Sequence, residues 1–404
     1  MLPQELWRVI LRESTIIPAP IIDIASLIDD WYESCRFNKA YCDPIKRRFA
    51  TTTKLRLMLV CKEWYSIVIE LLYEDIRPGS FEQMESLLSV LRADEQRDDV
   101  SGWSDGARIR HLGWWTKIFY PPKEEQRKGN EVVDLLIQLT SYFPNLVILS
   151  VAGYLTSSRN PGRLAQTLRN TCHSLQYLAC NHTHWNEELK PSTILDTVTL
   201  DYFGIPSLHY LSTIWAIDQT PLTCPVSHAR ITTLRLILSF SGSLRGMDSI
   251  RLPSLRHVHL TKHTAIRPCF QRFFTIHGPH IISFCSDISA RLLLEDPIMT
   301  RFTSLRDLIL WGQKWGPSAN EGTSLSHPSV IRLGIWISDL LRRLEPPALD
   351  RAWFPNLRVV KVMDDVADGW VGEERRALDS FLTEGTGVIY EDASGRVIQS
   401  VPAQ

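Results

Sequence analysis

The stretches LPSLRHVHL (252–260), FTSLRDLIL (302–310) and FPNLRVVKV (354–362) decide the fold that the sequence predicts. Each begins with a short turn, continues with an aliphatic anchor, and then places aliphatic residues at every second position. Alternation of this kind predicts a short strand with one apolar face. Earlier in the chain the same unit occurs as FPNLVILSV (143–151) and CHSLQYLAC (172–180). The strand unit is therefore repeated along most of the chain.

The spacing of these units indicates how the strands are arranged. The later anchors follow one another at intervals of 24, 26, 24, 25 and 27 residues, at Ile231, Leu255, Ile281, Leu305, Val330 and Leu357. Leucine-rich repeats have a period of about 20–29 residues, and neighbouring units stack because one unit alone cannot bury its apolar face. The sequence therefore predicts an α/β, leucine-rich-repeat-like solenoid with a parallel concave sheet over residues 105–370. A conventional α/β domain of alternating strands and helices is the alternative.

The residues around the repeats divide the chain further. ARIRHLGWW (107–115) is predicted to supply the first strand, and after Leu175 the next strand is either 195–200 or 207–213. Residues 77–104 are predicted to form a linker helix and a loop, with Ser80 and Gln83 as a capping box at the start of the helix. Residues 371–404 are predicted to form a cap that ends in a hairpin, because terminal repeats need one.

The composition excludes several classes of protein. The chain has 404 residues, of which 44% are hydrophobic and 22% are charged, and this is an ordinary globular mixture. Its formal net charge of −1 argues against a nucleic-acid partner. Charged residues and prolines interrupt the apolar stretches, so no signal peptide or membrane span is expected. Eight Cys residues are too sparse for a disulfide scaffold. We expect a cytoplasmic or nuclear protein.

Two apolar segments precede the repeats, MLPQELWRVILREST (1–15) and KLRLMLVCKEWYSIVIELLYEDI (54–76). Their apolar residues recur at steps of three and four, so each segment is predicted to form one helix. Both helices carry apolar residues beyond a single stripe. We therefore expect each helix to contact more than one partner.

These two segments together resemble an F-box, the module by which substrate receptors dock onto the Skp-type adaptor of cullin–RING ubiquitin ligases. The resemblance covers residues 1–76 and implies the following adaptor-binding residues: Leu2, Pro3, Leu6, Ile10, Leu11, Val60, Cys61 and Trp64. An ordinary F-box has a short link between these helices, whereas this chain has residues 16–54 there. Such expanded F-boxes occur in F-box proteins of mushroom-forming fungi, which this sequence resembles. The alternative is that residues 1–76 only cap the repeats.

The resemblance implies a function for the whole chain. It indicates a substrate-recognition subunit of an SCF-type ubiquitin ligase, which would join a Skp-type adaptor and a cullin scaffold to a target protein bound by the repeats. A protein-interaction scaffold without a link to ubiquitin is the alternative. The sequence contains no nucleophile elbow, P-loop, zinc-protease or dinucleotide-binding motif. We therefore expect neither enzymatic activity nor a cofactor.

The repeats also predict which side chains meet the target. In an LxxLxL strand the leucines face the core, so the third and fifth positions face outward. Together with the Trp residue that follows two of the strands, this phase predicts the following target-binding residues: Arg235, His257, His259, Asp307, Trp311, Arg332, Trp336 and Lys361.

One stretch resembles a metal site. CHSLQYLACNHTH (172–184) contains five residues of the types that bind zinc: Cys172, His173, Cys180, His182 and His184. Their spacing follows the strand pattern and matches no usual ligand pair. We therefore predict that this stretch holds no metal, and a metalloprotein is the third hypothesis for the chain.

Overall fold

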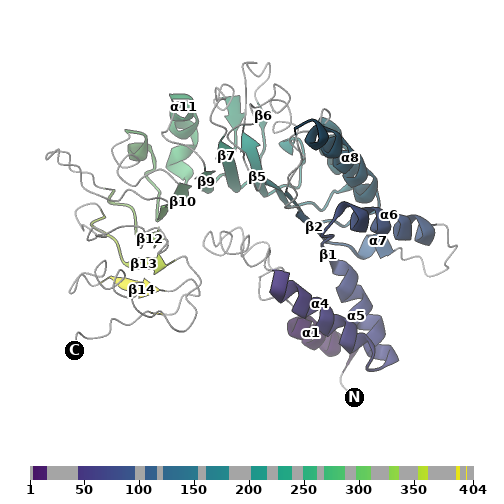
Figure 1. Cartoon of the computed structure of the whole chain (residues 1–404). Helices are drawn as coiled ribbons and strands as arrows, with labels where there is room; N and C mark the ends of the chain where they lie inside the picture. The colour runs from purple at the N-terminus through teal and green to yellow at the C-terminus, as the bar shows by residue number, and fades with distance from the viewer. Residues whose placement is uncertain are drawn as a thin grey trace. The chain divides into compact units, whose positions relative to one another are not determined.

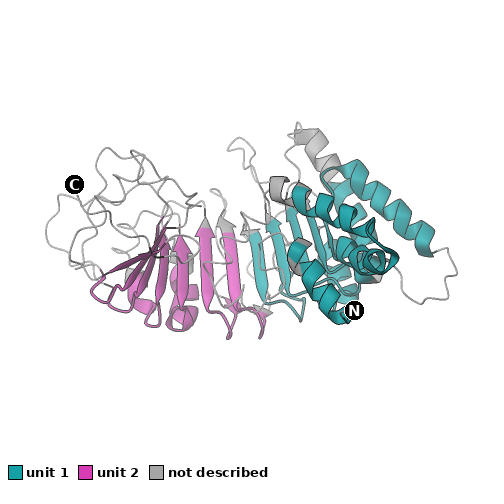
Figure 2. Ribbon diagram, turned by 90° about the horizontal axis from the view of Figure 1, so that it is seen from below, with its two compact units in different colours: residues 1–214 teal, residues 215–404 magenta. Residues whose placement is uncertain are grey.

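The structure is a computed structural model that describes residues 3–15, 44–95, 105–115, 122–152, 161–181, 202–215, 226–238, 249–261, 268–286, 297–310, 327–335, 354–362, 388–391 and 397. The chain divides into two compact units, residues 1–214 and residues 215–404 (Figure 2). The boundary falls inside the predicted solenoid, and the N-terminal helices belong to the same unit as the first repeats. In the part of the chain that is described, no helix combines the length and hydropathy of a membrane span.

Among the described residues, three helices form the N-terminal module of unit 1: α1 (Gln4–Thr15), α4 (Pro44–Met58) and α5 (Lys62–Glu74). Their shared core contains four buried residues: Leu11, Ile67, Val68 and Leu71. Trp7 and Trp64 pack against this core, and their ring centroids lie 5.0 Å apart at an angle of 55°. The two segments that the sequence singled out therefore pack together, with α4 as a third helix.

The prediction of one helix over residues 54–76 is wrong, because a turn at residues 59–61 divides it. The amides of Leu59 and Val60 bond to carbonyls three residues earlier, and Cys61 has an extended backbone. The Cys61 Sγ accepts a hydrogen bond from the Trp64 amide at 3.4 Å, and so caps the start of α5. Capping of this kind stabilises a helix start, and apolar periodicity alone does not reveal it. Residues 16–43, most of the predicted insert, lie outside the described residues.

The sheet of unit 1 contains five strands that are parallel and neighbour one another in chain order: β1 (Asp75–Ile76), β2 (His111–Trp115), β3 (Ile148–Ala152), β4 (Tyr177–Asn181) and β5 (Tyr210–Trp215). The strand after β4 is therefore the one predicted at residues 207–213. Four helices fill the connections: α6 (Phe81–Glu95), α7 (Asp105–Arg108), α8 (Pro122–Ser141) and α9 (Pro161–Thr171). Figure 1 shows α6 and α8 on the same side of the strands, with the module beyond β1. The predicted capping box is confirmed, since the Gln83 amide donates to Ser80 Oγ at 3.3 Å.

The sheet of unit 2 continues the same pattern with seven parallel strands in chain order: β7 (Thr233–Leu238), β9 (His257–Thr261), β10 (Ser283–Ser286), β11 (Asp307–Leu310), β12 (Arg332–Ile335), β13 (Val359–Val362) and β14 (Ile389–Glu391). The other described elements of this unit are β6 (Val226–Ser227), β8 (Ile250–Arg251), α11 (Pro268–His277), η3 (Gly278–His280) and η4 (Pro297–Arg301). The leucine-rich-repeat-like α/β fold is therefore confirmed. Strand β14 lies within the predicted cap, where Glu391 also bridges Val397 in antiparallel sense.

One backbone feature recurs from repeat to repeat. At eight described positions, from Arg110 to Ile331, the residue after an anchor offers its carbonyl to two successive amides of the next repeat. The Arg256 carbonyl, for example, accepts from Ile282 and Ser283 at 2.7 and 3.1 Å. The Ile282 carbonyl in turn accepts from the amides of Arg306 and Asp307. This pattern fixes the register of each strand against the next, so equivalent repeat positions form straight rows across each sheet.

Aromatic side chains fill the core behind β10. The rings of Phe274, Phe284 and Phe302 are fully buried, with centroids 5.0 to 5.8 Å apart. Phe274 comes from α11, Phe284 from β10, and Phe302 from the turn that precedes β11. The cluster therefore joins two consecutive repeats.

We predict that Phe284→Ala lowers the free energy of unfolding by about 3–5 kcal/mol, because a large cavity replaces the ring. The measurement is urea unfolding followed by circular dichroism. Ile389→Ala is the matched control, since Ile389 lies in the same unit but is half exposed; its effect should stay below about 1 kcal/mol. Equal effects of the two substitutions would contradict the assignment of this cluster to the core.

Candidate functional site

The first helix of the module carries two apolar faces. Trp7 and Leu11 point into the module core, whereas Leu6, Val9 and Ile10 are 48%, 56% and 45% exposed. The three exposed residues are separated by steps of three and four, so they lie together on one side of the helix. We call them the outer face of α1. A helix this short does not need a second apolar face for its own packing, so the outer face is a candidate contact surface.

More apolar side chains are exposed on the rest of the module. Leu59 and Val60, in the turn between α4 and α5, are 87% and 58% exposed. Phe49 and Leu55 of α4 and Tyr65 of α5 are exposed as well. Single exposed apolar residues are ordinary, but the described helices of this module and the turn between α4 and α5 present eight of them. This concentration is characteristic of a surface that another protein covers.

The structure divides the residues predicted to bind the adaptor into two groups. Five are exposed: Pro3, Leu6, Ile10, Val60 and Cys61. Leu11 is buried in the module core, so its assignment to the contact surface is wrong. Trp64 is half-buried and packs against that core, so it supports the surface from beneath. Leu2 lies outside the described residues.

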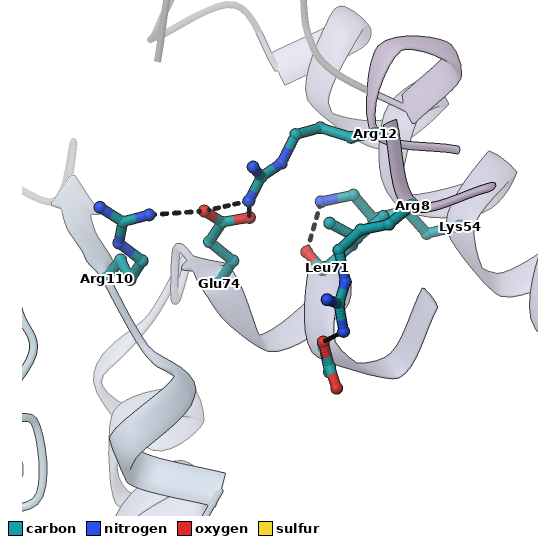
Figure 3. Close-up of polar contacts among 7 residues, drawn as sticks. Arg8, Arg12, Lys54, Leu71, Glu74 and Arg110 are labelled. Carbon is teal, nitrogen blue, oxygen red and sulfur yellow. Dashed lines mark hydrogen bonds and ion pairs between the residues drawn. The ribbon is translucent and has the colours of Figure 1, made fainter. Parts of the chain in front are cut away.

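The module is joined to the repeats through Glu74, the last residue of α5. Strand β1 follows directly and pairs with β2, while the Glu74 carbonyl accepts a hydrogen bond from the Arg110 amide at 3.1 Å. The Glu74 carboxylate accepts two hydrogen bonds from Arg12 Nη2, at 2.7 and 2.6 Å (Figure 3). Arg110 approaches the same carboxylate at 3.6 Å. Glu74 thus connects α1, α5 and the residue that precedes β2.

Two further contacts hold the helices of the module together. Lys54 of α4 donates to the carbonyl of Leu71 at 2.8 Å, near the C-terminal end of α5, where carbonyls lack helical partners (Figure 3). Burial lowers the pKa of Lys54, although Asp75 and Glu74 oppose that shift. Arg8 of α1 pairs with Glu70 of α5 at 2.7 Å on an exposed surface. The order of the three helices is therefore fixed by polar contacts as well as by the core.

A buried histidine lies beside this joint. His111 opens β2 and is paired in register with Asp75 of β1. Burial lowers its pKa to about 4, and this effect outweighs the opposing charges of Asp75 and Glu74. The imidazole is therefore neutral at pH 7, and its protonation would place a charge inside the first repeat.

The strand register brings several of the predicted target-binding residues into rows. Arg235 of β7 lies beside His259 of β9, and Asp307 of β11 lies beside Arg332 of β12. Lys361 of β13 occupies the row of His259, four strands further along the sheet. The register therefore aligns the predicted positions of neighbouring strands with one another. Trp311 and Trp336 lie outside the described residues.

The exposure predicted for His257, His259 and Asp307 is wrong. All three side chains are buried. Asp307 accepts hydrogen bonds from Arg332 Nε and Nη2 at 2.5 and 2.7 Å, and from Ser283 Oγ at 2.9 Å. In a parallel sheet each side chain has row neighbours on both sides, about 4.8 Å away, and these neighbours cover short side chains from water. Long side chains reach further: Arg332 is 47% exposed, and Arg235 and Lys361 are half-buried.

The stretch considered as a metal site has ordinary structural contacts where it is described. The Cys172 thiol donates to the carbonyl of Phe143 at 3.6 Å, and Cys180 lies on β4 in the core. Burial raises the pKa of Cys180 to about 12 and also raises that of Cys172, so both remain protonated, whereas metals bind the thiolate. His182 and His184 lie outside the described residues. Among those that are described, no three His, Cys, Asp and Glu residues are grouped as metal ligands would be.

Apolar periodicity did not predict the Glu74 joint, the contacts of Glu74 with Arg12 and Arg110. The signal was present, because Arg8 and Arg12 are one helical turn apart, and so are Glu70 and Glu74. Complementary charges at the same spacing on two helices predict a paired face once the helices are known to pack. Only the structure shows which two helices meet.

Comparisons with known proteins identify no family for this chain. No family model matches the sequence, and no curated protein matches it. Among solved structures, the leucine-rich repeat-containing protein LegL7 of Legionella pneumophila is similar with a TM-score of 0.38 and 15% identity, over 80% of this chain and 85% of LegL7. A chain of the yeast Rad7–Elc1 complex is similar with a TM-score of 0.35 and 14% identity, over 97% of this chain and 93% of that one. Similarities of this size assign no function.

We predict that Glu74→Gln lowers the free energy of unfolding of unit 1 by about 2 kcal/mol, since the charge-assisted hydrogen bonds with Arg12 are weakened in a largely buried position. Glu70→Gln removes the exposed ion pair with Arg8 and should change the free energy of unfolding by less than about 1 kcal/mol. Thermal and urea unfolding of both variants test this. Equal free energies of unfolding for the two variants would contradict the prediction and would indicate that apolar packing holds the joint.

We also predict that acid destabilises the first repeat through His111. Above pH 6.5 the imidazole is neutral in both states, so its contribution is constant. Between about pH 6.5 and 4 the unfolded state binds a proton that the folded state does not, so stability falls as pH falls. This one group contributes a slope of up to about 1.4 kcal/mol per pH unit. Urea unfolding across this range should be less pH-dependent in His111→Gln; an unchanged slope would contradict the lowered pKa.

Proposed function

We propose that this chain is the substrate-recognition subunit of an SCF-type ubiquitin ligase. In this proposal the outer face of α1 and the turn between α4 and α5 dock onto a Skp-type adaptor, which connects the chain to a cullin. The repeats bind a target protein. The proposal places the chain in the cytoplasm or the nucleus.

The observation that carries the proposal is the exposure of Leu6, Val9 and Ile10 on α1. The resemblance to an F-box predicted that Leu6 and Ile10 contact another protein, and both side chains are available for such a contact. Val60 and Cys61, which the resemblance also assigned to the contact, are exposed as well. Trp7 and Trp64 contact each other with tilted rings beneath this surface and support it.

The proposed mechanism is proximity. A receptor that holds its target beside the charged ubiquitin carrier converts an encounter in solution into a reaction within one assembly, and this raises the effective concentration of the target. The chain needs no reacting group of its own for this task. Within unit 1 the Glu74 joint holds the module, which carries the proposed adaptor surface, to the first repeats.

On the repeats, we assign target binding to long side chains that remain partly exposed beside their buried row neighbours. Arg332 is the strongest candidate, because Asp307 orients its guanidinium through two hydrogen bonds while nearly half of the side chain remains exposed. A guanidinium held in this way is suited to a directional contact with a carboxylate or a carbonyl. Arg235 and Lys361, which the register places in one row, extend the proposed surface.

We predict that Leu6→Asp combined with Ile10→Asp weakens adaptor binding by about a hundredfold or more, because two charges would be buried in an apolar interface. The measurement is co-purification of the tagged chain with a co-expressed Skp-type adaptor, followed by calorimetry. The fold should persist, since neither side chain belongs to the core, and circular dichroism checks this.

Val90→Asp is the matched control. Val90 is also half exposed and apolar, but it lies on α6, outside the module. Adaptor binding should survive this change. If the double variant folds and keeps the adaptor at wild-type affinity, the F-box proposal is wrong. If the wild-type chain binds other proteins but no adaptor, a scaffold without a link to ubiquitin is favoured instead.

A further inference from the structure

A cavity of about 910 Å³ lies where the module meets the first repeats. Each of the first three repeats contributes the two residues on either side of its anchor: Arg108 and Arg110, Asn145 and Val147, Ser174 and Gln176. The module contributes α1 and α5. We call this cavity the joint groove. Its volume is within the range of about 300–1,000 Å³ that is usual for ligand sites.

The chemistry of the joint groove changes along its length. Its lining includes the guanidinium groups of Arg108 and Arg110 from the first repeat, of which Arg110 approaches Glu74 at 3.6 Å. The next two repeats contribute the amides of Asn145 and Gln176 and the hydroxyl of Ser174. Amide and hydroxyl groups both donate and accept hydrogen bonds, as a peptide backbone requires. Asn145 and Ser174 precede their anchors and Gln176 follows its anchor, so these groups come from two neighbouring repeats, whose strands are about 4.8 Å apart. A ligand that fits this wall is extended and anionic at one end.

The basic end is unusual for this protein. Four arginines line the joint groove, with Arg8 and Arg12 from α1 joining the two from the first repeat, against two carboxylates, Glu70 and Glu74. The lining therefore carries an excess of two positive charges, whereas the whole chain has a net charge of −1. Such a local excess attracts anionic groups.

The two glutamates show how a carboxylate is held there. Glu74 is largely buried and binds Arg12 Nη2 through both oxygens, so it forms part of the wall. Glu70 is exposed and makes one bond of 2.7 Å with Arg8, which is also exposed. An exposed pair of this kind is weak, so a carboxylate from another molecule can replace Glu70 at Arg8.

We propose that the joint groove binds an extended acidic peptide, with Asp or Glu side chains at the arginines and neutral polar residues along the amides. Arginine binds carboxylates through two parallel hydrogen bonds, and this geometry favours a carboxylate ligand over a diffuse negative surface. The joint groove is distinct from the outer face of α1. Arg8 and Arg12 line the groove, whereas Leu6, Val9 and Ile10 do not. It does not depend on the proposed ligase function.

The test uses the full chain and a short fluorescein-labelled peptide of alternating Glu and Ser, followed by fluorescence polarisation. The wild type should bind this peptide and not its Gln–Ser counterpart, and binding should weaken with added salt. Arg8→Gln combined with Arg110→Gln should weaken binding by about tenfold or more. Arg163→Gln is the control, since Arg163 is an exposed arginine of the same unit with a single carboxylate partner, Asp134, at 3.0 Å; it should change binding less than about twofold.

A second variant has the opposite expected effect, so loss of folding cannot account for it. Glu70→Gln removes the carboxylate that competes for Arg8, and it should tighten binding of the Glu–Ser peptide. Equal binding of the Glu and Gln peptides overturns the proposal, and so does equal weakening by the Arg8/Arg110 and Arg163 variants. Weaker binding by Glu70→Gln also overturns it. A phosphoserine peptide that binds where the Glu–Ser peptide does not would overturn the assignment to carboxylates.

The two proposals fail separately. Leu6→Asp combined with Ile10→Asp should weaken adaptor binding by about a hundredfold or more and leave peptide binding unchanged. Arg8→Gln combined with Arg110→Gln should weaken peptide binding by about tenfold or more and leave adaptor binding unchanged. If adaptor binding is absent and the peptide still binds, only the ligase proposal fails.

Discussion

The arrangement of the described repeats depends on one recurring backbone contact, in which a carbonyl of one repeat accepts two amides from the next. This contact sets the register of every described strand pair in which it occurs, from Arg110 with β3 to Ile331 with β13. A shift of one residue would turn the buried aliphatic face toward water, so the hydrophobic core and this backbone contact enforce the same alignment. Because the alignment is fixed, a residue type at one repeat position always has the same position of the next repeat as its neighbour. This fixed alignment determines which side chains are neighbours in the polar rows of unit 2 and in the wall of the joint groove.

The N-terminal module has two kinds of surface, and they do different things. Trp7, Leu11 and Glu74 connect it to its own core and to the first repeat, as a cap of a repeat array must. Leu6, Val9 and Ile10 take no part in that packing. Capping the repeats and docking a partner are therefore compatible tasks for one module. The resemblance to an F-box and the interpretation as a cap describe different faces of the same three helices.

The sequence predicts much of this fold because the repeat is a local pattern. Strand positions, the anchors and the capping box at Ser80 all depend on residues a few positions apart. Three features were not predictable in this way. The turn at Cys61 depends on a thiol that caps a helix inside an unbroken apolar periodicity. The burial of His257, His259 and Asp307 depends on neighbours about one repeat away in the sequence, such as Ser283 and Arg332. The Glu74 joint depends on contacts between residues 12, 74 and 110, and no local pattern contains all three.

Helix α5 is followed directly by strand β1, and this connection affects local unfolding at the N-terminal end of the repeats. In a linear array the end repeat usually exchanges its amide protons fastest, because it has a neighbour on one side only. Here the first strand shares a peptide bond with a packed helix, and the amide of Arg110 is bonded to the last carbonyl of that helix. The N-terminal end cannot fray without also opening the module core around Ile67 and Leu71. Fluctuations of this end are therefore cooperative, so the module and the first repeat form a single unit of local unfolding.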